Sequence, residues 1–309
     1  MELPTRYNEY SEKHHIEGLS IPTLDALMKG DYDLGKARDF LEFQDCVNHE
    51  MLNHKVIAEN PYTQWFANAE LTLQQVKHFI VQFSVFSNQF LVAQLLKMLA
   101  ADNLKEMHAS KEILANEIGV VFNKHKAMTG NVEGVLERVS KDEKDFGSTT
   151  GSIEGGVFHF RAAHFELLVR TAEPLGLGFS DLGKRAYGTT QTLHYCDELK
   201  RLYGSEDYLT STTASYAVEN WAAAGFWDEL VNGLENFRNH NDLHNMPLTF
   251  FTWHSKVEAN HARHTQEELE QFYFEHEVDW DRFIREGNEM LDGVYTFWHG
   301  LDKQRRCLH

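Results

Sequence analysis

The chain has 309 residues, of which 42% are apolar, and it carries a formal net charge of −18. The apolar content is ample for a buried core and excludes a disordered chain. The acidic balance argues against nucleic acid or an anionic membrane as a partner, because either would be repelled. The three cysteines are widely spaced, no signal-like segment follows Met1, and we expect no apolar run long enough to span a bilayer. These features predict a cytoplasmic protein without disulfides.

The first 43 residues are polar and mixed, and we expect them to form an arm or short helices laid over the body. In the rest of the chain, apolar residues recur at three- and four-residue steps, as on the buried face of a helix. Thr72 and Gln75 have the spacing of a capping box, and Gly119 is suited to end a helix. The periodicity predicts helices over residues 43–59, 73–99, 104–118, 153–175, 180–201, 207–236, 248–276 and 279–301.

Residues 120–152 break this pattern with glycine, serine, threonine and a dense run of charges. We interpret them as an insertion with one short helix over 132–139, because loops of this length are usually lids or mobile segments. Strand-like alternation does not persist anywhere, and no internal repeat occurs. The sequence therefore predicts an all-α bundle of about seven or eight helices, with residues 44–309 forming a single domain behind the N-terminal arm of residues 1–43.

The segment from His254 to His261 places two imidazoles and a carboxylate on one stripe of a helix. At about 100° per residue, Glu258 lies roughly 40° from His254, and His261 lies roughly 20° from it on the other side. Two imidazoles and a carboxylate suit iron, manganese or zinc better than calcium or magnesium. The alternative is a solvated helix face with a hydrogen-bonded histidine.

Two glutamates elsewhere stand in apolar surroundings, where an unpaired carboxylate is costly. Glu117 lies near the end of a predicted helix, and Glu219 is the only acid in the small, apolar run 214–224. Both are candidate metal ligands, and the alternative for Glu117 is a surface position. Glu112 competes with Glu117, although it is displaced by about a turn and a half of helix.

His164 is the third ligand candidate outside the His254–His261 segment, because it lies in the predicted helix 153–175. Its competitors are His159, little more than a turn earlier, and His125, which is nearer to Glu117 in the sequence. Further acids and histidines occur at similar spacings but in polar or loop-like sequence, and we do not expect these to bind metal: Glu12, His15, His194, Glu198, His240 and His244.

Three carboxylates and three imidazoles from separate helices suit two divalent ions that keep open positions. A ferritin-like centre would need two Glu-x-x-His pairs, and only Glu258 and His261 provide one in the core. The order of segments over roughly residues 45–275 instead resembles the haem-oxygenase-like di-metal oxidases and oxygenases. The resemblance depends on Asn60-Pro61-Tyr62, Leu71–Gln75, the aromatic helix Phe79–Phe90, Glu117-Ile118-Gly119, His164–Leu168 followed by Leu175-Gly176-Leu177, Glu219, and the His254-x3-Glu258-x2-His261 motif.

The resemblance implies a haem-oxygenase-like seven-helix fold that binds two Fe(II) ions, or an iron–manganese pair. It also implies dioxygen as co-substrate and an external reductant. We expect a small free amino acid, or another small carboxylate, to be oxidised by C–H abstraction, with desaturation, cyclisation or C–C fragmentation as the outcome. Arg161, Arg170 or Arg263 could hold the substrate carboxylate. The implied metal ligands, which are also the catalytic residues, are Glu117, His164, Glu219, His254, Glu258 and His261.

Other functions stay open within this resemblance and beside it. The same di-iron site could serve N-oxygenation or decarboxylation to an alkene. A mononuclear iron enzyme would use only His254, Glu258 and His261, whereas a thiaminase-like hydrolase would need Cys46 or Cys196 as nucleophile. A non-enzymatic binding bundle is the fourth alternative. The insertion between Glu117 and His164 is the main departure from the family pattern, and the assembly could be a homodimer.

Overall fold

The computed structural model describes residues 4–121, 159–160 and 162–308, except for the side chains of residues 105, 109, 121, 159, 160 and 257–264. The described chain is mainly helical. Its α-helices are α1 (Thr5–His14), α2 (Ile21–Lys29), α3 (Leu34–Glu50), α4 (Lys55–Ala58), α5 (Pro61–Asn68), α6 (Leu73–Leu99), α7 (Leu104–Glu117), α9 (His164–Ala172), α10 (Thr190–Glu198), α11 (Tyr208–Ala222), α12 (Phe226–His240), α13 (Thr249–Glu275) and α14 (Trp280–Arg305).

Shorter elements connect these helices. Three 3-10 turns follow α9, namely η2 (Glu173–Leu175), η3 (Phe179–Asp181) and η4 (Arg185–Tyr187), and a π-helical turn, η5 (Leu199–Tyr203), continues α10. Two strands of two residues each, β1 (Val120–Val121) and β2 (His159–Phe160), pair in antiparallel fashion. The predicted all-α bundle is confirmed, with this small strand pair as its only sheet in the described residues.

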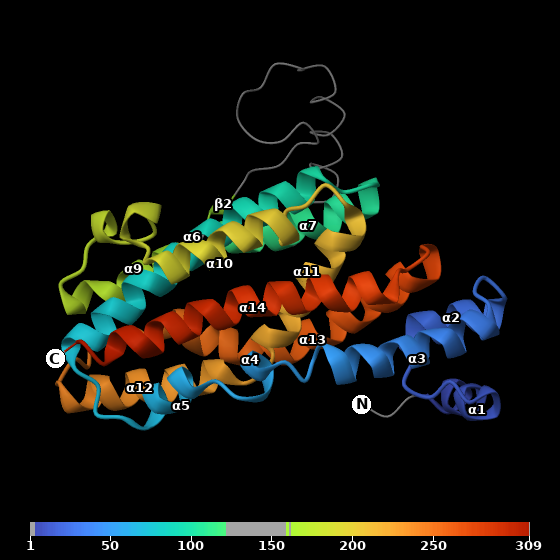
Figure 1. The fold of residues 1–309 in the computed structure, drawn as a ribbon, viewed down its shortest axis with the longest axis horizontal. Helices are drawn as coiled ribbons and strands as arrows, with labels where there is room; N and C mark the ends of the chain where they lie inside the picture. Colours follow the sequence, from blue (N-terminus) through green and yellow to red (C-terminus); the bar gives the residue numbers. More distant parts are fainter. Residues whose placement is uncertain (1–3, 122–158, 161, 309) are drawn as a thin grey trace, which may run out of the picture.

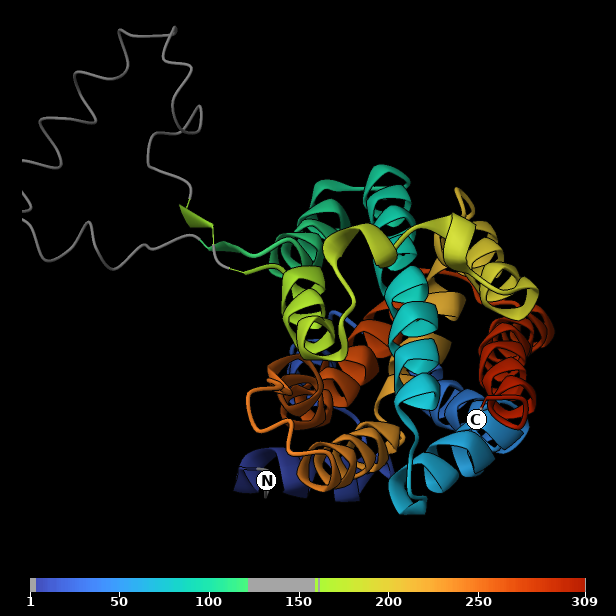
Figure 2. The ribbon, with the colours of Figure 1, turned by 90° about the vertical axis from the view of Figure 1, so that its left-hand side faces the viewer.

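The helices pack lengthwise around one interior. Figure 1 shows α14 along the long axis, with α10 and α6 above it, α5 and α12 below it, and α1 to α3 at one end. Figure 2 shows the same bundle from one end, with α6 in the middle, α9 to its left and α14 to its right. The interior is rich in aromatic rings: Phe66, Phe79, Phe83, Phe251 and Trp298 are all at most 2% exposed. This aromatic core surrounds the central helix α6.

The start of helix α6 is encoded locally, by a capping box at Thr72 and Gln75. The Thr72 hydroxyl accepts from the backbone N–H of Gln75, and the Gln75 side chain accepts from the Thr72 N–H, so the predicted capping box is present. By length and composition alone this helix could cross a membrane, which we did not expect from the sequence. Half of its most apolar window is buried inside the protein, as in the core helix of a bundle.

The N-terminal segment is tied to the body by a buried carboxylate. Glu270 of α13 is fully buried and accepts hydrogen bonds from the Ser20 backbone N–H at 3.0 Å and from the Ser20 hydroxyl. Ser20 is the residue before α2, so these bonds fix the start of α2 against α13. Burial raises the pKa of Glu270, and its hydrogen bonds from Ser20 act in the opposite direction.

Several predicted bounds are confirmed and others are wrong. Helices were predicted over 73–99, 104–118, 248–276 and 279–301, and α6, α7, α13 and α14 occupy these ranges closely. The single helix predicted over 207–236 is two helices, because Gly225 adopts a left-handed conformation with φ of +85° between α11 and α12. The helix predicted over 43–59 begins earlier, at Leu34, and ends at Glu50. The helix predicted from residue 153 begins only at His164, after β2.

The predicted insertion falls mostly outside the described residues. Residues 122–158, including the short helix expected over 132–139, are not described. What the structure does describe is the base of this segment, where Val120 pairs with Phe160 and Val121 with His159. The strand pair therefore joins the chain just after α7 to the chain just before α9.

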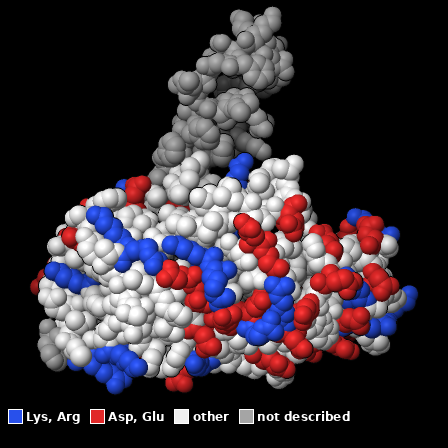
Figure 3. Space-filling model, turned by 45° about the horizontal axis from the view of Figure 1, so that its top comes forward, with Lys and Arg blue, Asp and Glu red and all other residues white. Residues whose placement is uncertain are grey.

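Many acidic side chains on the surface lie beside basic ones. Figure 3 shows Lys and Arg side chains lying beside Asp and Glu over much of one face. Arg282, for example, donates to Asp207 at 2.6 Å and to Glu286 at 2.8 Å. Arg201 pairs with both Glu198 and Glu289. Such exposed pairs contribute little to stability individually.

We expect Gly233→Ala to destabilise the fold, because α12 crosses α5 very closely at this glycine. A Cβ atom at position 233 would lie 2.3 Å from the backbone oxygen of Phe66. Backbone cannot move aside as a flexible side chain can, and overpacking typically costs about 1–3 kcal/mol. Urea unfolding should show this loss relative to Gly178→Ala, whose Cβ would meet nothing closer than 3.7 Å. Equal stability of the two variants would contradict this account of the α5–α12 contact.

Candidate metal centre

The centre begins where α7 ends and α9 starts. Glu117 is the last residue of α7, and His164 is the first residue of α9. The β1–β2 pair closes the base of the intervening segment and so brings these two helix ends together. As a result, His164 Nδ1 lies 2.8 Å from Glu117 Oε2, although the two residues are far apart in the sequence.

Glu117 and His164 lie at ion-pair distance, which is also the spacing of two adjacent metal ligands. His164 Nδ1 is buried and makes no hydrogen bond within the described part of the chain, although Glu117 Oε2 is so near. Adjacent ligands of a metal with bonds of about 2.1 Å lie roughly 3 Å apart at a right angle. The His164 side chain is only 9% exposed and the Glu117 side chain 18%, so water has limited access to these atoms.

His254 completes a group of three. One ligand atom from each of Glu117, His164 and His254 lies within 4.8 Å of the others, the only such group of possible metal ligands among the described residues. His254 is contributed by α13, so the three side chains come from three separate segments. A carboxylate and two imidazoles suit a divalent first-row metal, and the orphaned Nδ1 of His164 fits such an ion.

The imidazole of His254 is oriented by its own helix. Its Nδ1 donates to the backbone oxygen of Phe250, one turn earlier, at 2.7 Å. This hydrogen bond requires the proton on Nδ1, so Nε2 carries the lone pair that a metal needs. The ring also stacks on Trp227 of α12, with centroids 4.4 Å apart and planes 16° apart. Hydrogen bond and stacking together fix the direction in which Nε2 points.

Aromatic rings frame the histidine pair on the remaining sides. The ring of His164 lies 4.7 Å from that of Trp253 and 5.0 Å from that of His254. Phe250 packs on His254 with centroids 4.5 Å apart. A rigid aromatic frame of this kind limits side-chain motion and lowers the local dielectric, which strengthens charge interactions within it.

A cavity of about 360 Å³ opens beside the group, between α6, α7, α11 and α13. Glu117 and His254 line it, and so does Glu219, which α11 contributes. The three predicted ligand positions therefore face one space. Glu112, the competitor of Glu117, also lines this cavity, as does Glu268 of α13.

The remaining predicted ligands can be placed only in part. Glu258 and His261 lie on α13, whose helix runs unbroken through both positions, but their side chains are outside the described residues. His125 is also outside the described chain. His159 lies in β2, and its side chain is not described either. The metal-binding roles of these residues stay predictions.

Histidines and acids that we did not expect to bind metal have other surroundings. Glu198 pairs with Arg201, and His240 Nδ1 contacts the backbone oxygen of Asn236 at 2.7 Å. His244 lies beside Asp242 on an exposed turn. Of the arginines considered for a substrate carboxylate, Arg170 is exposed, and the side chains of Arg161 and Arg263 lie outside the described residues.

The cysteines offer no activated thiol among the surroundings that the structure describes. Burial raises the pKa of the Cys196 thiol to about 12, and burial together with the Glu50 carboxylate raises the pKa of Cys46. A raised pKa keeps a thiol protonated at neutral pH, whereas the thiolate is the nucleophile. A thiol-dependent hydrolase would need the opposite shift.

We therefore expect Cys196 to resist alkylation in the folded protein. Iodoacetamide at pH 8 should modify the exposed Cys307 first, Cys46 more slowly, and Cys196 only after unfolding. Peptide mass spectrometry of timed samples measures the three rates, with protein unfolded in urea as the control. Modification of native Cys196 as fast as Cys307 would show an accessible, ionised thiol and revive the thiol-dependent alternative.

No family model and no curated protein matches this chain. Several solved structures are similar to it in fold, two of which are described next. One is a domain of unknown function with a haem-oxygenase-like fold from Shewanella denitrificans, with a TM-score of 0.51 and 14% identity over 89% of this chain and 94% of that one. The other is a TenA homologue from P. horikoshii, with a TM-score of 0.50 and 13% identity over 84% of this chain and 97% of that one. The predicted haem-oxygenase-like fold is thereby confirmed.

Proposed function

We propose that this chain uses its haem-oxygenase-like scaffold as a non-haem di-iron enzyme that oxidises a small amino acid with dioxygen. The observation that carries the proposal is the convergence of Glu117, His164 and His254 beside a cavity that Glu117, His254 and Glu219 line. Glu258 and His261 would complete the ligand set from the same stripe of α13 as His254. The fold and the resemblance in motif order support this ligand set.

The donor set suits two ferrous ions in charge as well as in kind. Three carboxylates offset three of the four positive charges of two divalent ions, and imidazoles bind divalent iron without excessive stabilisation. An iron–manganese pair would be held by the same groups. Ions bound here would supply the redox chemistry that activates dioxygen for attack on a carbon–hydrogen bond.

The protein's own side chains orient the metal ligands and exclude water from the substrate. The Phe250 carbonyl holds His254 in the tautomer that presents Nε2. The rings of Phe83, Phe86 and Trp221 line the cavity and keep a substrate carbon in a dry space beside the ligands. A reaction that removes hydrogen from an unactivated carbon needs such exclusion, since reactive species would otherwise attack water or side chains.

The electron balance defines the external requirement. Desaturation of an amino acid releases two electrons and two protons, whereas reduction of dioxygen to two waters takes four of each. The other two electrons must therefore come from an external reductant. Cyclisation by C–H abstraction has the same balance, and N-oxygenation or decarboxylation to an alkene are the alternative outcomes at the same site.

Anaerobic loading with Fe(II) followed by exposure to oxygen tests the proposal. We expect about two iron atoms per chain, and oxygen consumption that accelerates with at least one amino acid of a panel. Transient visible absorption and mass spectrometry of the products would identify the substrate. Loading with manganese and iron together, followed by elemental analysis, decides between the two metal pairs. Failure to take up iron would contradict the proposal.

Two other functions are separated by the same measurements. A mononuclear iron enzyme would take up one iron per chain. A thiaminase-like activity is suggested by the similarity to a TenA homologue, and it would appear as thiamine loss in iron-free protein. The raised pKa of Cys196 counts against that activity, because a protonated thiol is a poor nucleophile.

A further inference from the structure

A second, smaller cavity of about 110 Å³ adjoins the one that faces the candidate metal ligands. It lies where the end of α6 meets α7, α11 and α13. The two cavities share four lining residues: Ile113, Ser215, Thr265 and Glu268. A ligand that occupied both would place one end in the small cavity and the other beside Glu117 and His254.

The small cavity contains a lysine without a partner carboxylate. Lys97, in the last turn of α6, donates from Nζ to the Ser215 hydroxyl at 2.5 Å. Within the described residues it forms no ion pair, and its nearest aromatic ring is Tyr203, with Nζ 5.0 Å from the centroid. Burial lowers the pKa of Lys97, opposed by the charges of Glu268, Glu219 and Glu106. A buried ammonium that no carboxylate contacts directly is costly, so an anion bound beside it would be stabilised.

Glu268 presents the opposite charge to the same space. It makes no hydrogen bond or ion pair in the part of the chain that the structure describes, although its charge acts on Lys97. The other two carboxylates of this cavity are occupied. Glu106 accepts from the Asn103 side chain and the Asp102 backbone N–H, and Glu275 accepts twice from Gln271.

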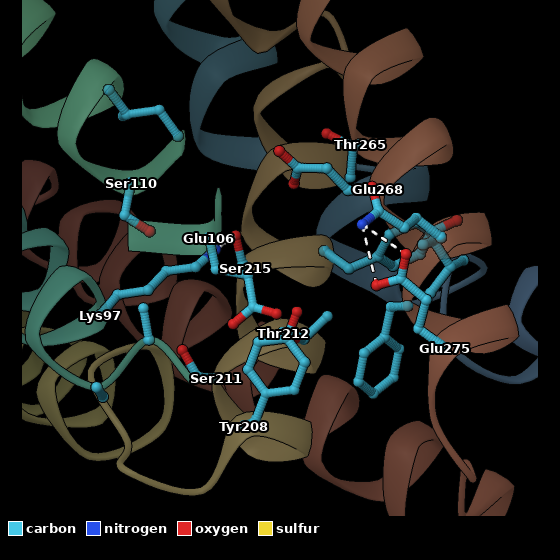
Figure 4. Close-up of a pocket in the computed structure, with 17 residues that line it drawn as sticks. Lys97, Glu106, Ser110, Tyr208, Ser211, Thr212, Ser215, Thr265, Glu268 and Glu275 are labelled. Atoms are coloured by element: carbon cyan, nitrogen blue, oxygen red, sulfur yellow. Dashed lines mark hydrogen bonds between the residues drawn. The ribbon is translucent and has the colours of Figure 1, made fainter. Parts of the chain in front are cut away.

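Lys97 and Glu268 therefore bring a cation and an anion to one cavity without touching each other. Figure 4 shows Lys97 reaching towards Ser215 from one side and Glu268 lying across the cavity on the other. Tyr208 lies on the same side of the cavity as Ser211 and Thr212, and burial and the Glu106 carboxylate raise the pKa of its hydroxyl, which keeps it a proton donor. A zwitterion is the ligand whose charges match this arrangement.

We propose that the small cavity binds the charged end of an α-amino acid, with Lys97 and Ser215 meeting its carboxylate and Glu268 meeting its ammonium group. The side chain of the amino acid then extends into the larger cavity towards His254. This inference rests on the proposed function for the reaction that follows, but the binding itself does not depend on iron. A zwitterion fits better than a fatty acid, because three glutamates and only one lysine line the small cavity. The glutamates would repel a ligand that carries a carboxylate and no positive charge.

Isothermal titration calorimetry with a panel of common L-amino acids tests the ligand class. Each amino acid is compared with the carboxylic acid that lacks its amine and with the amine that lacks its carboxylate. The titrations use iron-free protein and, under nitrogen, Fe(II)-loaded protein. We expect at least one amino acid to bind and both of its truncated analogues to bind roughly 10- to 100-fold more weakly, since each loses a charge-assisted hydrogen bond. No binding by any amino acid, or equal binding by its deaminated analogue, would overturn the inference.

Variants assign the two charges. Lys97→Met keeps the length of the side chain and Glu268→Gln keeps its shape, and each should raise the dissociation constant of that amino acid by roughly 10- to 100-fold. Lys77→Met on α6 and Glu267→Gln on α13 are matched controls, because neither residue lines either cavity. Glu268 is exposed, so Glu268→Gln should fold even if Lys97→Met does not. Unchanged affinity in folded Lys97→Met or in Glu268→Gln would contradict the assignment.

Iron content, measured on the same samples, separates the two proposals. Normal iron uptake without amino acid binding would contradict the amino acid subsite and support the metal site. Amino acid binding without iron uptake would contradict the metal site and support the amino acid subsite.

Discussion

Replacing His164 with alanine should weaken iron binding by at least about 100-fold and reduce oxygen-dependent turnover to the background rate. His164 contributes the buried Nδ1 that lies 2.8 Å from Glu117 Oε2 and has no hydrogen bond in the described part of the chain. Loss of a mere supporting residue around a metal typically costs 10- to 100-fold in affinity, so loss of a direct ligand should cost at least as much. Anaerobic titration with Fe(II), followed by absorption and elemental analysis, measures the change.

A matched control is His194→Ala, since His194 is an exposed histidine on α10 and lines neither cavity. This variant should bind iron as the parent protein does. Thermal unfolding of both iron-free variants checks that neither has lost the fold. If His164→Ala were to load iron normally, the contact with Glu117 would be an ordinary ion pair and the centre would have to be sought elsewhere.

The most local features of the fold were the easiest to predict from the sequence. The Thr72–Gln75 capping box is encoded within four residues, and it begins α6 where the pattern predicts. Gly119 ends α7 with φ of +73°, again as its position suggests. Gly225 shows the limit of such reasoning, because it stands in a helical pattern of alanines and aromatics that continues on both sides. Its left-handed conformation, with φ of +85°, separates α11 from α12 in the structure, but nothing in the pattern around it indicates that break.

In the candidate site, too, the features that follow from local periodicity were predictable and the contacts between distant segments were not. The position of His254 on a stripe of α13 follows from helical periodicity, and its proximity to His164 agrees with the order of motifs. The strand pair that brings Glu117 to His164 is only two residues long on each side, too short for any alternation to predict. Trp227 stacks on His254, and Lys97 bonds to Ser215, across different helices. Contacts of this kind have no characteristic spacing in the sequence.

Replacing Glu219 with alanine should lower the iron content from about two atoms per chain to one or none. Glu219 comes from α11, a different helix from those of Glu117 and His254, and it lines the same cavity, where the proposed second ion needs a further carboxylate. Without Glu219, only two carboxylates would offset the four positive charges of two divalent ions. The second ion should therefore be lost first. Elemental analysis after anaerobic loading and desalting gives the stoichiometry.

Glu112→Ala provides the comparison for Glu219→Ala, because Glu112 lines the same cavity from α7 but is exposed to solvent. Glu112→Ala should retain two iron atoms per chain. It should also keep its oxygen-dependent turnover, whereas Glu219→Ala should lose turnover together with its iron. A parent protein with one iron, together with unchanged loading in Glu219→Ala, would instead favour the mononuclear centre of His254, Glu258 and His261. A loss of iron in Glu112→Ala but not in Glu219→Ala would indicate that Glu112 of α7, and not Glu219, binds the second ion. The pair of variants therefore locates the second ion as well as counting it.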